Sequence, residues 1–240
     1  MKPLILLGAP RSGTNVLRDT LCSSNKFITW DCDEINYIWR VGLARSISDE
    51  FNKNDVNNFN KSYIRNCFRK VTSRKIILKH NPYIVEKTCA NCLRLDFVNN
   101  ILPEAKYIYI KRNPFDSISS IRDRWLGETS SKYLLKKAKF IPKNDLIYYS
   151  LRYLKHRIYQ KFSTTKELPS WGPRFNGIDK FRQQNSLIET CAMQWYQCTT
   201  KVENNINLLL ENNKKVFTIE YEKFTTAPEQ VLREMINYFD

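Results

Sequence analysis

The sequence contains no long hydrophobic run. No apolar stretch reaches the roughly 20 residues that a membrane-crossing helix needs, and the apolar segment at the start of the chain is only Leu4–Leu7. A secretory signal peptide needs a longer apolar region than this, of about 7–15 residues. The sequence therefore predicts neither a membrane span nor a signal peptide, and we expect a cytoplasmic protein of the bacterial soluble type.

The sequence also lacks the cysteine pattern of a disulfide-stabilised secreted protein. Its seven cysteines are an odd number with scattered spacing, which indicates reduced thiols; they are Cys22, Cys32, Cys67, Cys89, Cys92, Cys191 and Cys198. Cys89 and Cys92 form a lone Cys-x-x-Cys pair without the second Cys or His pair that a zinc site needs. We expect two packed thiols there, and no metal site.

Acidic residues are few. The 24 Asp and Glu stand against 39 Lys and Arg, which gives a net charge of +15. Such an excess suggests an anionic partner: a nucleotide, a nucleic acid, an acidic glycan or a membrane face. The 240 residues, 42% of them hydrophobic and 13% aromatic, are enough for a globular core, and we expect one domain over residues 1–240.

An anion-binding turn is predicted close to the N-terminus. Leu4–Leu7 is a short apolar run of the kind found in buried parallel strands. Gly8–Gly13 is a loop with a glycine at each end, and from Thr14 the apolar residues Val16, Leu17 and Leu21 follow at helical spacing. A strand, a glycine-bounded loop and a helix N-terminus in this order direct several backbone N–H groups at one point.

This loop lacks the lysine of a nucleotide-binding P-loop. The spacing Gly-x4-Gly matches, but Thr14 and Asn15 stand where Lys and Ser or Thr are required, and the cation of the loop is Arg11. A kinase uses that lysine to hold the β- and γ-phosphates of ATP. The loop therefore disfavours ATP chemistry, although a P-loop kinase stays an alternative.

A second strand-to-helix corner is predicted around Arg112. Lys106–Lys111 is the clearest later strand, and Asn113 and Pro114 suit the N-cap and first position of a following helix. Ser120 follows Arg112 by eight residues. An arginine offers a two-pronged donor to a phosphate, and a serine hydroxyl on the next helix turn adds another donor.

Together these motifs resemble the sulfotransferases that use 3′-phosphoadenosine 5′-phosphosulfate (PAPS) and release 3′-phosphoadenosine 5′-phosphate (PAP). Pro10–Thr14 (PRSGT) resembles the 5′-phosphosulfate loop of the tyrosylprotein and bacterial saccharide-type branches, and Arg112 with Ser120 resembles their 3′-phosphate site. A third segment, Glu86–Thr88 (EKT), resembles a family motif in which Cys89 here replaces a proline. Asn113 likewise replaces an aspartate. The resemblance covers residues 4–36, 84–125 and 190–240.

The resemblance implies roles for individual residues. Arg11 and the backbone of Ser12–Asn15 would hold the 5′-phosphosulfate, and Lys87 would stabilise the bridging oxygen as it leaves. The residues implied in cofactor binding are Pro10, Arg11, Ser12, Gly13, Thr14, Asn15, Arg112 and Ser120.

A base must take the proton of the acceptor hydroxyl, and Asp31, Asp33 and Glu34 form the acidic cluster after the first predicted helix. Glu34 is our first candidate, Asp33 the second and His80 the third.

The middle of the chain, residues 126–185, lies outside the resemblance. It is basic and rich in tyrosine, and Leu151, Leu154 and Ile158 suggest an amphipathic helix. One interpretation is a solvated basic surface. The other is an acceptor-binding insertion or lid, in which Trp171 and tyrosine faces contact sugar rings.

The predicted fold is α/β, a P-loop-like parallel sheet of four to five strands with helices on both faces. Lys75–Lys79 and Lys215–Tyr221 are two further expected strands, and Asp49–Lys61 reads as a surface excursion. The predicted function is sulfuryl transfer from PAPS to a hydroxyl, with a saccharide as the favoured acceptor and no nucleic acid expected. The alternatives are a P-loop kinase and a non-catalytic binder of nucleic acid or anionic glycan.

Overall fold

The computed structural model of the chain describes residues 1–74, 81–127, 131–162, 168, 170–211 and 214–239. Its elements, in chain order, are β1 (Lys2–Leu7), α1 (Thr14–Cys22), β2 (Phe27–Ile28), α2 (Asn36–Trp39), η1 (Lys53–Asp55), α3 (Asn58–Arg74), β3 (Tyr83–Lys87), η2 (Cys89–Leu93), α4 (Leu95–Ile101), β4 (Lys106–Lys111), α5 (Pro114–Leu126), α6 (Ser131–Ala138), η3 (Lys143–Asp145), α7 (Leu146–Phe162), α8 (Ile178–Gln184), α9 (Leu187–Glu211), β5 (Val216–Glu220), α10 (Tyr221–Thr226) and α11 (Pro228–Phe239).

The described strands form one parallel sheet in the order β2-β3-β1-β4-β5. β1 lies at the centre, with Leu6 opposite Lys87 of β3 and Leu7 opposite Tyr109 of β4. Because all strands run the same way, the ends of β3, β1 and β4 lie side by side at one edge of the sheet. The predicted α/β architecture is confirmed.

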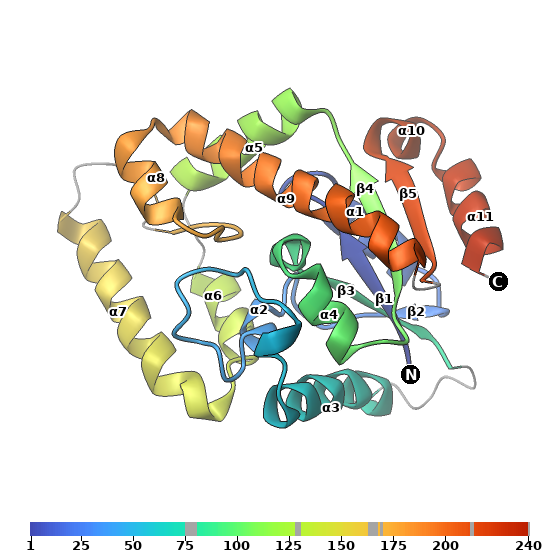
Figure 1. Cartoon of the computed structure of the whole chain (residues 1–240), viewed down its shortest axis with the longest axis horizontal. Helices are drawn as coiled ribbons and strands as arrows, with labels where there is room; N and C mark the ends of the chain where they lie inside the picture. The colour runs from blue at the N-terminus through green and yellow to red at the C-terminus, as the bar shows by residue number, and fades with distance from the viewer. Residues whose placement is uncertain (75–80, 128–130, 163–167, 169, 212–213, 240) are drawn as a thin grey trace.

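Helices cover both faces of this sheet (Figure 1). Side chains alternate along β1: Ile5 and Leu7 join a core cluster with residues of α3, α4 and α9, whereas Leu4 and Leu6 join a second cluster with α1 and α11. All four are at most 1% exposed, and each such burial stabilises the fold by about 1.5–3 kcal/mol. The uninterrupted apolar sequence of β1 therefore follows from its burial on both sides.

The strand next to β1 is β3, Tyr83–Lys87. The expected strand Lys75–Lys79 and the candidate base His80 lie outside the described residues. β3 ends at Lys87, so the Glu86–Thr88 motif lies at the edge of the sheet where β1 and β4 also end.

The helical spacing of Phe115, Ile118, Ile121 and Trp125 predicts one buried stripe on α5. Phe115 is 80% exposed, so its assignment to this stripe is wrong. On α1, Val16 is 50% exposed, whereas Leu17 and Leu21 are buried. Phe115 belongs to the first turn of α5, ahead of the part that packs on α9, where Ile121 and Trp125 are buried. The predicted start of α5 is confirmed: the Phe115 N–H donates to the Asn113 side chain at 2.9 Å, and Pro114 is the first helical residue.

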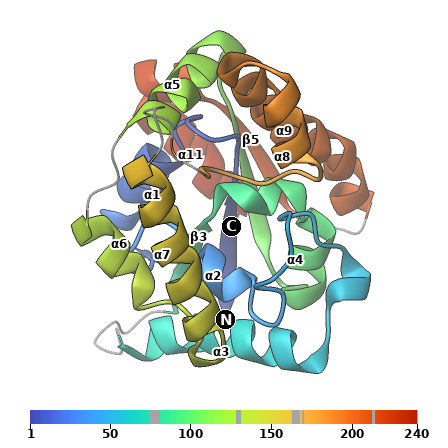
Figure 2. The same cartoon turned by 90° about the vertical axis from the view of Figure 1, so that its left-hand side faces the viewer.

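The segment of residues 126–185 contributes α6, η3, α7 and α8, with α7 at the outside of the molecule in both views (Figures 1 and 2). A loop of this segment is attached to the body by Asp49, whose N–H donates to the Arg174 carbonyl at 2.7 Å and whose carboxylate accepts from the Arg174 N–H at 2.9 Å. Asp49 is 2% exposed, so the expected surface excursion begins with a buried residue. No helix in the described part of the chain is long and apolar enough to cross a bilayer.

Candidate active site

The loop after β1 has the backbone shape of an anion cradle. Arg11 and Gly13 have left-handed φ angles of 68° and 91°, and alternation of this kind turns successive N–H groups toward one concavity. The Ser12 hydroxyl closes the turn by donating to the Ala9 carbonyl at 2.7 Å. Gly13 is needed for a second reason, because a Cβ atom there would lie 2.2 Å from the ring of Tyr221.

Arg112, at the end of β4, packs against the same loop. Its Nη1 donates to the Arg11 carbonyl at 2.8 Å, and its guanidinium lies 4.7 Å from the centre of the Tyr221 ring. The neighbouring Asn113 N–H donates to the Glu222 carboxylate at 2.9 Å. The first turn of α10 therefore supports both the loop and the corner. Sequence reasoning gave Tyr221 no role at the site.

Ser120 of α5 completes the junction. The Nε of Arg11 donates to the Ser120 hydroxyl at 2.9 Å. The structure thus brings Arg11, Arg112 and Ser120 together, although the loop and the corner are more than 100 residues apart in the sequence.

The donor groups of this junction fit a ligand with two phosphate-type groups. Two guanidiniums, hydroxyls and loop N–H groups are all donors to anionic oxygens. The Nε of Arg112 in this junction is buried without a hydrogen-bond partner among the described residues. A buried donor in this state is costly unless a ligand satisfies it, so the residues present suit PAPS.

Glu34 and Lys87 form the second part of the site. Nζ of Lys87 donates to Oε1 of Glu34 at 2.7 Å, and the Cys89 N–H lies 3.4 Å from the same oxygen. Lys137 of α6 lies 3.9 Å from Oε2 of Glu34 and 3.8 Å from the Asp33 carboxylate. The Glu34 side chain is 23% exposed and that of Lys87 5%. The two predicted residues are therefore brought together, and Lys137 is a cation that sequence reasoning missed.

The charges of this cluster fix its protonation. Burial raises the pKa of Glu34, but the charges of Lys87 and Lys137 and the hydrogen bonds from Lys87 and Cys89 outweigh it and lower the pKa to about 2. Burial lowers the pKa of Lys87, yet the Glu34 carboxylate contributes to a net upward shift. The pair is thus carboxylate and ammonium at neutral pH.

A buried hydrogen-bond chain supports the residue after Glu34. The Ile35 N–H donates to the Thr88 hydroxyl at 3.2 Å, and this hydroxyl donates to Oε1 of Glu86 at 2.6 Å. The Asn91 side chain donates to Oε2 of Glu86 at 2.7 Å. Burial raises the pKa of Glu86 to about 7, because the hydrogen bonds and the charge of Arg94 offset only part of its effect.

A buried ionic network supports Asn36, the second residue after Glu34. Arg94 donates to the Asn36 side-chain oxygen at 2.6 Å, and the Asn36 amide donates to Asp49 at 3.3 Å. Arg40 donates to the same Asp49 carboxylate at 2.6 Å. Sequence reasoning missed this network, since its members are far apart in the chain and no local pattern connects them.

Of the other residues that the sequence singled out, His80 lies outside the described residues. Asp31 is exposed. Cys89 and Cys92 are buried, and Sγ of Cys92 accepts from the Gly8 N–H at 3.2 Å. Among the described residues, no group of three His, Cys, Asp or Glu is placed to hold a metal ion.

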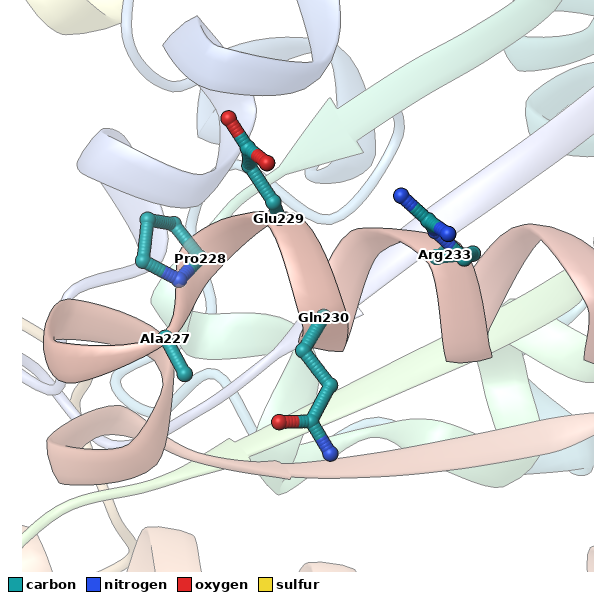
Figure 3. Close-up of a pocket in the computed structure, with 5 residues that line it drawn as sticks. All are labelled: Ala227, Pro228, Glu229, Gln230 and Arg233. Carbon is teal, nitrogen blue, oxygen red and sulfur yellow. The ribbon is translucent and has the colours of Figure 1, made fainter.

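A cavity of about 570 Å³ lies at the start of α11 (Figure 3). It is lined by Ala227, Pro228, Glu229, Gln230 and Arg233. None of the predicted site residues belongs to this lining.

The model of the sulfotransferase family matches residues 3–160, more than half of the chain. No curated protein matches.

Among solved structures, the sulfotransferase domain of the Synechococcus olefin synthase is 12% identical with a TM-score of 0.49, covering 99% of this chain and 72% of that one. A mouse sulfotransferase in complex with PAP is 13% identical with a TM-score of 0.44, covering 99% and 58%. A gluconokinase from Sinorhizobium meliloti is 9% identical with a TM-score of 0.30, covering 86% and 97%. This chain thus spans less than two thirds of the mouse enzyme. From the match of the family model, the chain belongs to the sulfotransferase family, and its sulfuryl donor is PAPS.

Proposed function

We propose that this enzyme transfers the sulfuryl group of PAPS to a saccharide hydroxyl, with Glu34 as the base. The observation that carries the proposal is the pairing of Glu34 with Lys87 at 2.7 Å, at the end of the strand next to the phosphate loop. A cation and a carboxylate beside an anion cradle are the groups that transfer to a hydroxyl requires.

The loop Gly8–Gly13 and the corner Arg112–Ser120 form the donor side. Arg11 and the N–H groups of Ser12–Asn15 hold the 5′-phosphosulfate, and Pro10 and Gly13 shape the loop around it. Arg112 and Ser120 hold the 3′-phosphate. Ser120 accepts a hydrogen bond from Arg11, and its own O–H remains available to donate, since a hydroxyl does both. When bound, PAPS supplies the sulfuryl group.

Lys87 links the donor side to the base. An ammonium has three N–H donors, so Lys87 is able to hold Glu34 and the bridging oxygen of the leaving group together. While Lys87 is directed only at Glu34, the pKa of the carboxyl is about 2 and the base is weak. As the charge of Lys87 is shared with anionic oxygens of the donor, the pKa of Glu34 rises. Glu34 then accepts the proton of the attacking hydroxyl.

Residues 126–185 form the acceptor side of the one domain that we assign to residues 1–240. Lys137 of α6 reaches Asp33 and Glu34. Tyr37 follows Glu34 by three residues. The ring of Tyr149 in α7 lies edge to face with the ring of Tyr37, and the ring centres are 4.6 Å apart. Aromatic faces and cations beside a base suit the rings and hydroxyls of a saccharide. Trp171 packs against the cluster around Trp125 instead, and we assign it no contact with the acceptor.

Ligand-induced thermal stabilisation tests the donor. We expect PAP to raise the melting temperature and ATP or ADP at equal concentration to raise it much less, because only PAP offers a 3′-phosphate to Arg112. Sulfate transfer from labelled PAPS to a saccharide panel then tests the acceptor, with a tyrosine peptide and a lipid alcohol as competitors. Labelling of the peptide alone would disprove the saccharide assignment and leave the donor assignment intact.

A further inference from the structure

Helix α7 exposes an apolar stripe to solvent. Ile147, Leu151, Leu154 and Ile158 are each more than half exposed, from 52% for Ile158 to 77% for Ile147. Their spacing of four, three and four residues places them along one side of the helix. A surface helix normally turns such a stripe toward the core. The amphipathic helix that the sequence suggests is present, and its apolar side faces outward.

The opposite side of α7 holds the helix on the protein. Tyr149 is 7% exposed and contacts Tyr37 edge to face at 4.6 Å. At 3.6 residues per turn, Tyr149 lies opposite the line through Leu151 and Leu154. Figure 1 shows α7 at the left edge of the molecule, and Figure 2, which views that side, shows α7 in front with no described element covering it. The outward direction of the stripe is therefore set by the aromatic contact.

Basic residues border the stripe. Leu146–Phe162 contains Arg152, Lys155, Arg157 and Lys161 and no Asp or Glu. Lys155 and Arg157 are exposed, and the helical period places them on the two edges of the stripe. Long cationic side chains in these positions extend to phosphate headgroups while the apolar side chains insert between lipids.

From this arrangement we propose that α7 binds the surface of an anionic lipid bilayer, with Ile147, Leu151, Leu154 and Ile158 inserted and Lys155 and Arg157 on the headgroups. Charge complementarity selects this occupant. A second copy would bring together two helices whose charged residues are all basic, and these charges would repel. An anionic headgroup layer neutralises them. The helix has 17 residues and about 25 Å of length. It lies along the interface, since no helix among the described residues is able to cross the bilayer.

In this orientation α7 lies between the bilayer and Tyr37, which Tyr149 contacts. Glu34, three residues before Tyr37, is then on the side of α7 that faces the protein. The membrane contact does not depend on the proposed transfer, because it uses residues outside the donor side and the base.

Vesicle flotation of the full chain tests the proposal. We expect the protein to float with vesicles of equal parts phosphatidylcholine and phosphatidylglycerol and to stay unbound with phosphatidylcholine alone. The double variant Leu151→Ser/Leu154→Ser changes two exposed side chains and leaves the charge unaltered. Its binding to the anionic vesicles should be at least about tenfold weaker than that of the wild type. Ile188→Ser on α9, which is 45% exposed, is the matched control and should float like the wild type.

Three results would overturn the assignment. They are absence of flotation with the anionic vesicles, equal flotation of the double variant, and a lipid-free dimer that the double variant abolishes, which would make a second copy the occupant. Light scattering after size-exclusion chromatography detects the dimer. Unchanged circular-dichroism melting of both variants shows that they fold. Donor binding, measured with PAP, reports separately on the proposed function.

Discussion

The donor side and the acceptor side of the molecule are held together in different ways. On the donor side, the loop Gly8–Gly13, the corner Arg112–Ser120 and Tyr221 contact one another at the ends of paired strands. The acceptor side reaches the body through contacts such as Lys137 with Glu34 and the backbone of Arg174 with Asp49, and its Phe175 and Ile178 join the main core. The first arrangement suits a fixed ligand, whereas the contacts of residues 126–185 converge on the region around Glu34.

Glu34 lies where the two sides meet, and it responds to both. Lys87 reaches it from the sheet and Lys137 from α6. A change at Glu34 should therefore slow transfer and leave donor binding intact. A change at Arg112 should weaken donor binding and leave the base unaffected. Variants at Glu34 and at Arg112 therefore separate the two sides.

The largest expected effect follows from Glu34→Gln. Loss of the base should lower kcat by the roughly 10²–10⁴-fold typical of general base catalysis, with affinity for PAP within about twofold of wild type. Single-turnover transfer from PAPS and calorimetry with PAP measure the two quantities.

Asp33→Asn is the matched control, since it removes a neighbouring carboxylate that also lies near Lys137, and it should cost clearly less. The pKa of about 2 for Glu34 in the free protein also predicts no acidic limb from this group above about pH 4 in kcat/KM for PAPS, which reports on the donor-free enzyme. Near-normal turnover of Glu34→Gln together with inactivity of His80→Ala would move the base to His80.

A smaller effect, on stability, is expected at Glu86 beneath the base. Its pKa is raised to about 7, so the folded state holds a proton that the unfolded state releases near pH 4.5. This contribution is fully present below about pH 4.5 and is lost as the pH rises to about 7. It amounts to about 3 kcal/mol at about 1.4 kcal/mol per pH unit.

Glu86→Gln cannot ionise at this position, so its free energy of unfolding should not fall as the pH rises from about 4.5 to 7. Urea unfolding of both proteins at pH 5 and pH 8 measures the difference in the free energy of unfolding. A difference that does not change with pH would show that Glu86 has an ordinary pKa. The depressed pKa of Glu34 acts in the opposite sense, since its contribution is lost only as the pH falls from about 4.5 toward 2.

Much of the donor side was predictable because its geometry is local. The order strand, glycine-bounded loop and helix defines the cradle within Leu4–Leu21, and the Asn113 and Pro114 signals define the start of α5. The parallel sheet then follows from apolar strands separated by helices. That the ends of β1 and β4 meet is a consequence of the parallel arrangement, and it brings Arg11 to Ser120 without any further signal.

The supports of the base were not predictable in the same way. Lys137 and Arg94 contact the Glu34–Asn36 segment from distant parts of the chain, and a single sequence contains no pattern that pairs them. Asp49 shows the same limit: its polar neighbours suggest a surface loop, whereas two arginines bury its carboxylate. The outward direction of the α7 stripe also depends on tertiary contact, because helical spacing gives a side of the helix but not what covers it.

Donor recognition is the next effect in size. Arg112→Ala should weaken PAP binding by about 1.5–3 kcal/mol, the range for a hydrogen bond to a charged group. Binding of adenosine 5′-phosphosulfate, which lacks the 3′-phosphate, should change little. Calorimetry with both ligands makes the comparison, and equal losses would show that Arg112 acts through the Arg11 carbonyl that it holds. Melting of the free protein tells whether the loop itself has been destabilised.

The smallest effect concerns the hydrogen bond between Thr88 and the Ile35 N–H. The Thr88 hydroxyl accepts from this N–H and donates to Glu86, so it positions Glu34 without contacting the donor side. Thr88→Val keeps the shape and removes both bonds, leaving the Ile35 N–H and a Glu86 oxygen unpaired. We expect kcat to fall by about tenfold, equivalent to about 1.4 kcal/mol of lost positioning, with KM for PAPS unchanged. Thr88→Ser restores the hydroxyl and should recover most of kcat, although it removes the same methyl group that a packing role would need. If Thr88→Val keeps near-normal kcat while Thr88→Ser is slow, the methyl and not the hydroxyl matters, and the chain from Glu86 to Ile35 does not position the base.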